Sequence, residues 1–404
     1  MRDRRFPGIG DPALFGLQML LALLGIAMIY SAGQVEVPSV ATGIWTRQLV
    51  WLGMALVAFS VATKVPTRWL EWFAPWLYVF AIGLLVLVLI IGTGPNTRSW
   101  FQVGPARLQP AEVAKLATIL MIARLLSGKD QDFAGLSRLW KPVALVLVPF
   151  ALVLLQPDLG SAVIFGVILI AALFWVGVPL VKIFLLVSPA MSLLLGFNWV
   201  VWGAWFIIIV VFLYFHRPFI LESISVILAN FAAGALTVPL WDSLATYQQN
   251  RLLVFLDPEI DARGAGYHLI QSKVAIGSGG LFGQGFARGP QKRLAFLPEQ
   301  HTDFLGSVIG EELGFVGVVF FLALFGLLLW RLLRIAVAAS DDFGSTLVFC
   351  LSGIIFAHLI VNLGMTVGLM PITGLPLPLL SYGGSFLLLL FTGLGITQRV
   401  AAQR

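Results

Sequence analysis

The chain has 404 residues, of which 59% are hydrophobic and 11% are charged, and its mean hydropathy is +0.97. A soluble domain needs far less apolar sequence, so this composition argues against one and indicates a membrane protein. Each spanning helix needs about 20 apolar residues, which leaves room for roughly ten or more spans and one sizeable loop. We therefore predict an all-α polytopic integral membrane protein with about 10 to 12 transmembrane helices.

The net charge is +6, but in a membrane protein the placement of Lys and Arg first reports topology, so we expect no nucleic-acid partner. The single cysteine, Cys350, lies within an apolar run. Without a second thiol, neither a disulfide nor a cysteine-based metal site is available.

Apolar runs predict spans near residues 13–30, 45–63, 74–92, 111–126, 142–156, 159–177, 180–196, 199–215, 219–240, 304–333, 346–367 and 384–397. The crowded region 178–240 leaves two counts open. Three closely connected helices there give about twelve spans, whereas one interrupted helix gives about ten. In both cases residues 1–404 form a single transmembrane domain.

Basic residues predict the orientation. Many of them fall on the side of the N-terminus, which the positive-inside rule identifies as the cytoplasm. They are Arg2, Arg4, Arg5, Lys64, Arg68, Arg124, Lys129, Arg138, Lys141, Lys182, Arg217, Arg331, Arg334, Arg399 and Arg404. Both termini are then cytoplasmic, and the segments left outside are 32–44, 93–110, 241–303 and 368–383.

The longest outer segment, residues 241–303, precedes the third-last span and is too long to be a passive connection. Its cations are Arg251, Arg263, Lys273, Arg288, Lys292 and Arg293. Two roles stay open for them: binding of an anionic ligand, or contact of a solvated loop with membrane lipid headgroups. In the same segment Tyr267, Ile270 and Val274 share one helical face, which predicts a short amphipathic helix in the membrane interface.

A glycine-rich stretch from Gly277 to Gly285 resembles a phosphate-binding loop, but no offset gives G-x-G-x-x-G and no βαβ pattern surrounds it. We therefore expect no nucleotide. Its backbone N–H groups either face an anion or belong to a flexible turn. The motifs of ATPases, zinc proteases and serine hydrolases are absent as well, and nothing indicates an organic cofactor.

Several polar features interrupt the apolar spans. Glu112 and Lys115 stand three apart at a helix start, which predicts an ion pair that faces a polar cavity, ties helices together, or does both. Asp158 is expected to cap the helix that follows it, and His358 to be a packed residue. Residues 362–385 are rich in Pro and Gly, which predicts a re-entrant element packed against the site.

Residues 296–312 carry a polar segment straight into an apolar span. Its ionisable members are Glu299, His301, Asp303, Glu311 and Glu312. So much charge beside an apolar span indicates a functional role. The competing structural role is helix capping, because Thr302 or Asp303 directly precedes the predicted helix.

Four stretches, residues 266–280, 296–304, 310–314 and 362–385, resemble in this order the shape, elongation, division and sporulation (SEDS) proteins RodA and FtsW. The resemblance covers nearly the whole chain and is closer to the RodA branch. It implies a peptidoglycan glycosyltransferase, a hexosyltransferase that polymerises lipid II into undecaprenyl-linked glycan for cell elongation and rod shape. The implied location is the outer face of the bacterial cytoplasmic membrane, and the implied partner is a class B penicillin-binding protein.

Three departures from the family pattern stand out. Residues 178–240 are longer than usual and predict a two-helix insertion. Ala111 occupies a position where Ser is common, and Phe386 one where a small residue is common. None of them touches Asp303, the position that matches the family's essential loop aspartate.

Asp303 suits the implied reaction as a general base. Lipid II carries its sugar on a pyrophosphate, so undecaprenyl pyrophosphate leaves readily and one carboxylate acting on the acceptor hydroxyl can suffice. An exposed Asp has a pKa of about 3.9 and is a weak base, so we predict that burial or Glu299 raises it. Cations, or a divalent ion such as Mg or Mn, are expected to stabilise the departing charge.

The predicted substrate-binding residues are outer cations, residues of the polar helix start and polar members of the motifs. They are Arg98, Trp100, Glu112, Lys115, Gln271, Lys273, Ser278, Arg288, Lys292, Glu299, His301, Ser381, Tyr382, Gly383, Gly384 and Ser385.

Two other functions would use the same features. A lipid II flippase needs a polar cavity and an anion-binding loop but makes no bonds, and a scaffold for the penicillin-binding protein needs neither.

Overall fold

The computed structural model describes residues 10–36, 41–94, 98–104, 106–128, 135–216, 218–261, 264–294, 296–297 and 299–403. Seven cations used above to predict orientation or loop charge lie outside the described residues: Arg2, Arg4, Arg5, Lys129, Arg217, Arg263 and Arg404.

Helices dominate the described residues, as predicted. They are α1 (Pro12–Ala32), α2 (Ile44–Ala62), α3 (Thr67–Ile91), α4 (Pro110–Leu126), α5 (Trp140–Leu154), α6 (Leu159–Trp175), α7 (Leu180–Leu195), α8 (Trp199–His216), α9 (Ile220–Ser243), α10 (Thr246–Leu256), α11 (Ala265–Gly279), α12 (Pro290–Arg293), α13 (Leu305–Val337), α14 (Asp342–Val367) and α15 (Gly384–Ala402). Short 3₁₀ turns cover Leu136–Leu139 and Pro258–Asp261.

The predicted spans coincide with α1 to α9 and α13 to α15. Nine helices in the described part of the chain are long and apolar enough to cross a membrane, and α6 and α7 are shorter apolar helices. The region 178–240 forms three separate helices, α7, α8 and α9, which favours the higher count. Its status as an insertion relative to the family stays a prediction.

A short β-hairpin, which the all-α prediction did not include, is also present. Strands β1 (Phe101–Val103) and β2 (Ala106–Leu108) pair antiparallel, with Phe101 opposite Leu108. The turn between them uses Gly104 at φ +61°, where a side chain would be strained. The hairpin lies in the connection between α3 and α4, one of the segments predicted to be outside.

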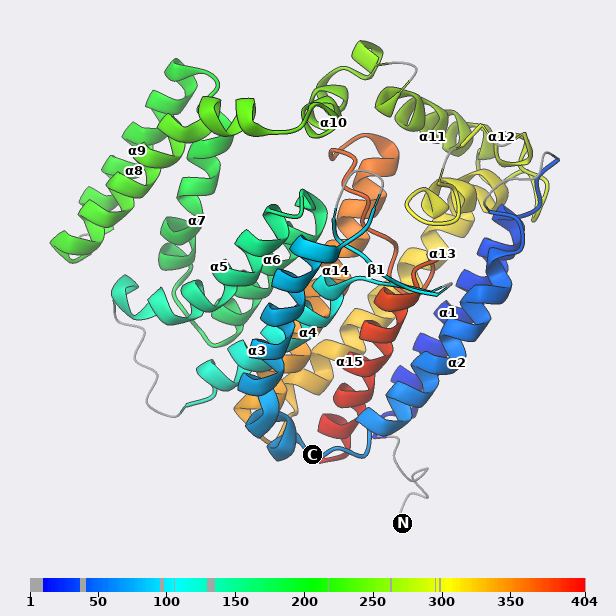
Figure 1. The fold of residues 1–404 in the computed structure, drawn as a ribbon, viewed down its shortest axis with the longest axis horizontal. Helices are drawn as coiled ribbons and strands as arrows, with labels where there is room; N and C mark the ends of the chain where they lie inside the picture. The colour runs from blue at the N-terminus through cyan, green and yellow to red at the C-terminus, as the bar shows by residue number, and fades with distance from the viewer. Residues whose placement is uncertain are drawn as a thin grey trace.

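The helices form a central bundle with a peripheral group on one side (Figure 1). In the apolar stretch of α14, 61% of the residues are buried, and in that of α15, 78%, so these two helices lie at the centre. In the apolar stretch of α8 only 11% are buried. Helices α7 and α9 hold each other through buried polar side chains: Ser192 donates to Asn230 Oδ1 at 2.6 Å, and Asn230 donates to Ser188 Oγ at 2.8 Å. Side-chain hydrogen bonds of this kind are common between helices in membranes.

The two ends of the described chain meet at one end of the bundle, away from α10, α11 and α12 (Figure 1). The Asp11 N–H donates to Gln398 Oε1 at 2.7 Å, and Gln398 Nε2 donates back to the Asp11 carbonyl at 2.9 Å. Arg331 of α13 adds an ion pair with Asp11 at 2.5 Å. The first and last spans are therefore tied on the face opposite the long loop.

Helix α13 is broken at Gly314, whose φ of 65° and ψ of −165° are not helical. The glycine-rich stretch fits into this break. The N–H groups of Gln284 and Gly285 donate to the carbonyls of Glu311 and Glu312, both at 2.9 Å, and the Phe315 N–H donates to Gly280 at 2.9 Å. The N–H groups of Gln284 and Gly285 are therefore used inside the protein, and the stretch is held against the break in α13 by backbone hydrogen bonds and is not a free turn.

Candidate active site

Asp303 lies in the turn that joins the long loop to α13, and two other segments fix its position. The Asp303 carbonyl accepts a hydrogen bond from Asn362 Nδ2 at 2.8 Å, and the same amide donates to the Leu375 carbonyl at 2.7 Å. Gly374, at φ +73°, allows the backbone to approach: a Cβ there would lie 3.3 Å from Asp303 Oδ2. The turn, α14 and residues 368–383 therefore converge on this carboxylate.

The helix-capping role predicted as the alternative for Thr302 or Asp303 is wrong. The residue at the N-cap of α13 is Phe304, and no side chain caps the helix there. Thr302 Oγ1 instead donates to the Glu299 carbonyl at 3.2 Å. The Asp303 side chain is thus left available for chemistry.

The surroundings of Asp303 favour its protonated form more than water does. The pKa of Asp303 is raised from 3.8 to about 7, chiefly by burial and then by the carboxylates of Glu299 and Asp158, while Arg251 opposes these effects. Burial and Glu299 are the two causes predicted from the sequence. A carboxylate with a pKa near the working pH is suited to accept a proton from a hydroxyl group.

His301 and Tyr382 meet in the same loop region, and His301 is two positions before Asp303. The Tyr382 N–H donates to the His301 carbonyl at 2.9 Å, and the two rings lie 5.9 Å apart. His301 Nε2 lies 4.0 Å from Glu299 Oε2. Burial lowers the pKa of His301 while Glu299 opposes this effect, so the neutral imidazole is favoured at neutral pH. The structure thus brings together three of the predicted substrate-binding residues.

The segment from Ser381 to Ser385 forms the entry to α15 and is held largely by protein contacts. Gln48 of α2 donates to the Ser381 carbonyl and accepts from the Gly383 N–H, both at 3.4 Å. Ser381 Oγ accepts from the Leu377 N–H at 3.0 Å. A side chain on Gly384 would collide with the Trp51 indole, so this glycine allows α2 and α15 to approach.

Residues 368–383, which overlap the start of this segment, are irregular backbone, as the Pro and Gly content predicted. Leu375, Leu377, Leu379 and Leu380 are each at most 3% exposed. Irregular backbone at membrane depth is stable only where protein covers it or where it lines a cavity. Burial of these leucines places the segment against the bundle, beside Asp303.

A buried ion pair lies on α4. Lys115 Nζ is 2.8 Å from Glu112 Oε1, which confirms the predicted pairing, and Lys115 is fully buried. Lys115 also lies 5.7 Å from the centre of the Phe386 ring, which stacks on His358 at 4.3 Å. His358 is buried, as predicted, and its Nδ1 lies 3.2 Å from the Pro376 carbonyl.

Several buried polar atoms on α4 and α14 have no protein partner in the described part of the chain. Within the described residues, Glu112 Oε2, His358 Nε2 and Asn362 Oδ1 are buried and have no hydrogen-bond partner. Buried polar atoms in native proteins are normally satisfied, so these positions suit water or a polar substrate group. This observation favours the polar-cavity role of the Glu112 pair alongside its structural one.

The predicted outer cations are not all placed alike. Arg98, Lys273 and Arg288 are exposed. Lys273 extends from α11 toward the start of the irregular segment, where a Cβ on Gly368 would lie 2.6 Å from its Nζ. Lys292 differs from them, because it is fully buried.

The remaining predicted residues have local contacts. Trp100 exchanges backbone hydrogen bonds with Thr93 beside the hairpin, at 3.2 and 2.9 Å. Gln271 and Ser278 are partly buried on α11, and Ser278 Oγ donates to the Ala275 carbonyl at 2.8 Å. Helix α11 itself was predicted, but its fully covered positions include Leu269 and Ala275, whereas Val274 on the predicted face is 45% exposed.

Some interactions at this site were not predicted from the sequence, although Arg251 was counted among the loop cations. Asn362 fixes the Asp303 backbone, Arg251 acts on its charge, and Gln109 donates to Asp158 at 2.8 Å. Asp158 also accepts from the Ser161 N–H at 3.0 Å, which confirms its predicted capping role. Asn362 could have been noticed in the sequence, because it is a polar residue within an apolar span and lies one helical turn after His358.

Across the described part of the chain, no group of three or more His, Cys, Asp or Glu side chains could hold a metal ion. The described side chains alone therefore do not fit a resident metal. Magnesium often binds through one or two carboxylates together with substrate phosphates, so the donors of a bound pyrophosphate would be needed.

The model of the cell cycle protein family FtsW/RodA/SpoVE matches residues 12–404. The chain belongs to this family. Peptidoglycan glycosyltransferase MrdB of Escherichia coli K12 is 35% identical over 395 residues, covering 98% of this chain and 94% of the relative. Peptidoglycan glycosyltransferase RodA of Treponema pallidum is 33% identical over 435 residues, covering 99% and 100%.

Solved structures agree with this family membership. A chain of a peptidoglycan synthase complex that coordinates polymerization and crosslinking has a TM-score of 0.72 at 31% identity, with 97% of both chains covered. RodA of Thermus thermophilus has a TM-score of 0.63 at 29% identity, covering 97% of this chain and 96% of that one. The SEDS protein described here is thus a multi-pass membrane glycosyltransferase of the RodA type.

Proposed function

We propose that this SEDS protein polymerises lipid II into glycan strands for cell elongation, with Asp303 as the general base. The observation that carries the proposal is the partly buried carboxylate of Asp303, whose pKa is raised where the long loop, α14 and the irregular segment converge. A base of this kind is what a reaction with a good leaving group requires.

The proposed step balances with one carboxylate. Asp303 takes the proton of the acceptor hydroxyl, the hydroxyl oxygen bonds to the anomeric carbon of the donor, and the bond from that carbon to the pyrophosphate oxygen breaks. Undecaprenyl pyrophosphate leaves with the bonding electrons. Arg98, Lys273 and Arg288 are exposed cations that can stabilise its charge.

A divalent ion, Mg or Mn, stays a prediction that the donor set of the protein does not support by itself, and no step above uses one. Measuring polymerisation after chelation and after re-addition of each ion tests this prediction.

We also propose that the site faces the outside of the bacterial cytoplasmic membrane and that both termini are cytoplasmic. Two observations support this orientation. Both ends of the described chain meet at one end of the bundle, and α10 to α12 lie at the other (Figure 1). The Lys and Arg residues of the short loops indicate which end is cytoplasmic, through the positive-inside rule.

A class B penicillin-binding protein is the proposed partner. Support comes from the solved relative whose complex coordinates polymerization and crosslinking. A transpeptidase beside the polymerase would crosslink new strands as they form.

Purified protein incubated with lipid II, with and without this partner, tests the proposal. Glycan chains from the wild type and none from Asp303→Asn, with equal expression and folding, are the expected results. Transfer of lipid II between leaflets without polymer would identify a flippase, and neither product would identify a scaffold.

A further inference from the structure

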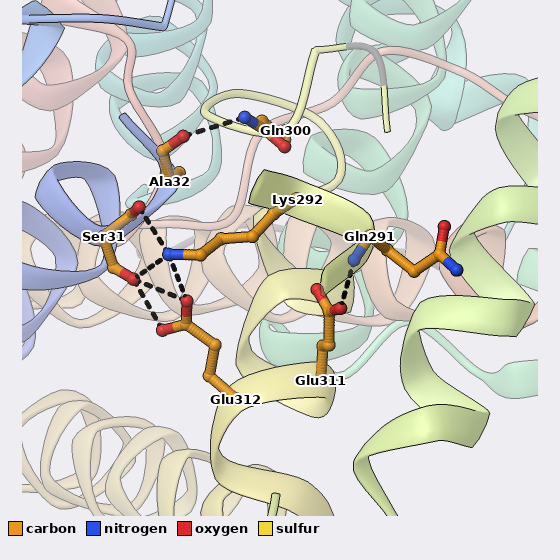
Figure 2. Close-up of polar contacts among 7 residues, drawn as sticks. All are labelled: Ser31, Ala32, Gln291, Lys292, Gln300, Glu311 and Glu312. Carbon is orange, nitrogen blue, oxygen red and sulfur yellow. Dashed lines mark hydrogen bonds and ion pairs between the residues drawn. The ribbon is translucent and has the colours of Figure 1, made fainter. Parts of the chain in front are cut away.

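A buried cluster connects the long loop to two spans. Figure 2 shows the Lys292 ammonium pointing between Ser31 of α1 and Glu312 of α13. Lys292 Nζ lies 2.6 Å from both the carbonyl and the hydroxyl of Ser31 and forms an ion pair with Glu312. Ser31 Oγ in turn lies 2.6 Å from both carboxylate oxygens of Glu312.

These three side chains are closed to ligands. Each of the three residues has 0% exposure. An ammonium group has three protons, and Lys292 has three acceptors, so no donor is left over. Lys292 is therefore buried and fully hydrogen-bonded, unlike the exposed outer cations with which it was predicted to bind substrate.

Two further contacts fasten the chain on either side of Lys292. The Gln291 N–H donates to Glu311 Oε1 at 2.7 Å, and Gln300 Nε2 donates to the Ala32 carbonyl at 2.8 Å (Figure 2). The end of α1 and the first turns of α13 thus hold the loop from two sides, and Asp303 follows Gln300 by three positions.

Because α13 is broken at Gly314, the contacts described above matter for the position of the residues before the break. Residues 305–313 precede Gly314, whose backbone is not helical. The helical hydrogen bonds are therefore interrupted between residues 305–313, which begin two positions after Asp303, and the rest of α13. Their position has to be set by contacts such as the one that Glu312 makes.

We propose that Lys292 is a positioning residue that, through Glu312 and Ser31, holds Asp303 in its reactive place. It does not contact the substrate. The proposal rests on the polymerase function proposed above.

The decisive experiment is lipid II polymerisation by purified variants with the partner present. In Lys292→Met, kcat is expected to fall about 100-fold, the loss typical of a misplacement of about 1 Å, with KM for lipid II unchanged. The double variant Lys292→Met/Glu312→Gln removes both buried charges, so we expect it to recover at least about tenfold of that loss. Glu36→Gln is the matched control, because it removes an exposed carboxylate paired with the next residue, Arg293, at 2.9 Å.

Other outcomes overturn the proposal. A raised KM in Lys292→Met with kcat retained, and no recovery in the double variant, would identify Lys292 as a substrate-binding cation. If Lys292→Met does not fold, the double variant decides alone: wild-type KM supports positioning, and a raised KM overturns it.

A second measurement needs no catalysis. Hydrogen–deuterium exchange of residues 299–304 should be faster in Lys292→Met than in the wild type and in Glu36→Gln. Unchanged exchange there overturns the proposal. If the wild type makes no glycan, the polymerase function fails, while the exchange measurement still reports on the fastening.

Discussion

Replacing Asp303 with Asn should stabilise the folded protein at alkaline pH while it abolishes polymerisation. The pKa of Asp303 is raised from 3.8 to about 7 in the folded state. Between these values the folded state binds more protons than the unfolded state, so this group lowers stability progressively as pH rises through the window. Asn is similar in size and carries no charge, so it avoids the loss.

The magnitude follows from the shift. About three pKa units at 1.36 kcal/mol each give an upper value of about 4 kcal/mol. Asp303 keeps partial exposure, and solvent screening reduces the expected gain to about 2 kcal/mol. A gain of this size raises the apparent Tm of a chain this long by a few degrees, roughly 2 to 4 °C.

Thermal unfolding in detergent, followed by tryptophan fluorescence at pH 8 and pH 4.5, measures the effect. The gain should be larger at pH 8 than at pH 4.5. Asp242→Asn, at an exposed position near the end of α9, is the control and should leave Tm unchanged at both values. A wild-type Tm for Asp303→Asn at pH 8, or an equal gain at both values, would refute the reasoning.

The rate of polymerisation should fall below about pH 7 as Asp303 becomes protonated, and Glu299→Gln should move this limb to lower pH because Glu299 raises the Asp303 pKa. A pH–rate profile tests this, and coincident limbs contradict it. Lys115→Met should destabilise by about 3 to 5 kcal/mol because it leaves the buried Glu112 unpaired. The Tm of Lys115→Met/Glu112→Gln should recover part of the loss, and an even lower Tm would argue against the ion pair. Gly314→Ala should lower stability by roughly 1 to 3 kcal/mol, because position 314 has a φ of 65°; denaturation that matches the wild type would show that the break is not required.

Local patterns in the sequence predicted what local physics determines. Apolar runs located the spans because a helix must satisfy its own backbone within lipid. The spacing of Glu112 and Lys115 predicted their pairing, since residues three apart share a helix face. Asp158 precedes an apolar helix and caps it.

The features that were missed depend on residues far apart in the chain. Lys292 was grouped with ligand-binding cations because its acceptors, Ser31 and Glu312, come from other elements, and Ser31 lies 261 positions away. The glycine-rich stretch was judged as an isolated loop, although its backbone partners belong to α13. Capping by Asp303 was a reasonable local expectation, but the turn from Glu299 places Phe304 at the cap instead.

The tie between Asp11 and Gln398 joins positions 387 apart, and it constrains the order of assembly. During synthesis the first span enters the bilayer long before its partner in α15 exists. The Ser381 and Gly383 contacts with Gln48 also wait for the last part of the chain. The contacts that join the first two spans to α15 and its entry can therefore form only after translation is nearly complete.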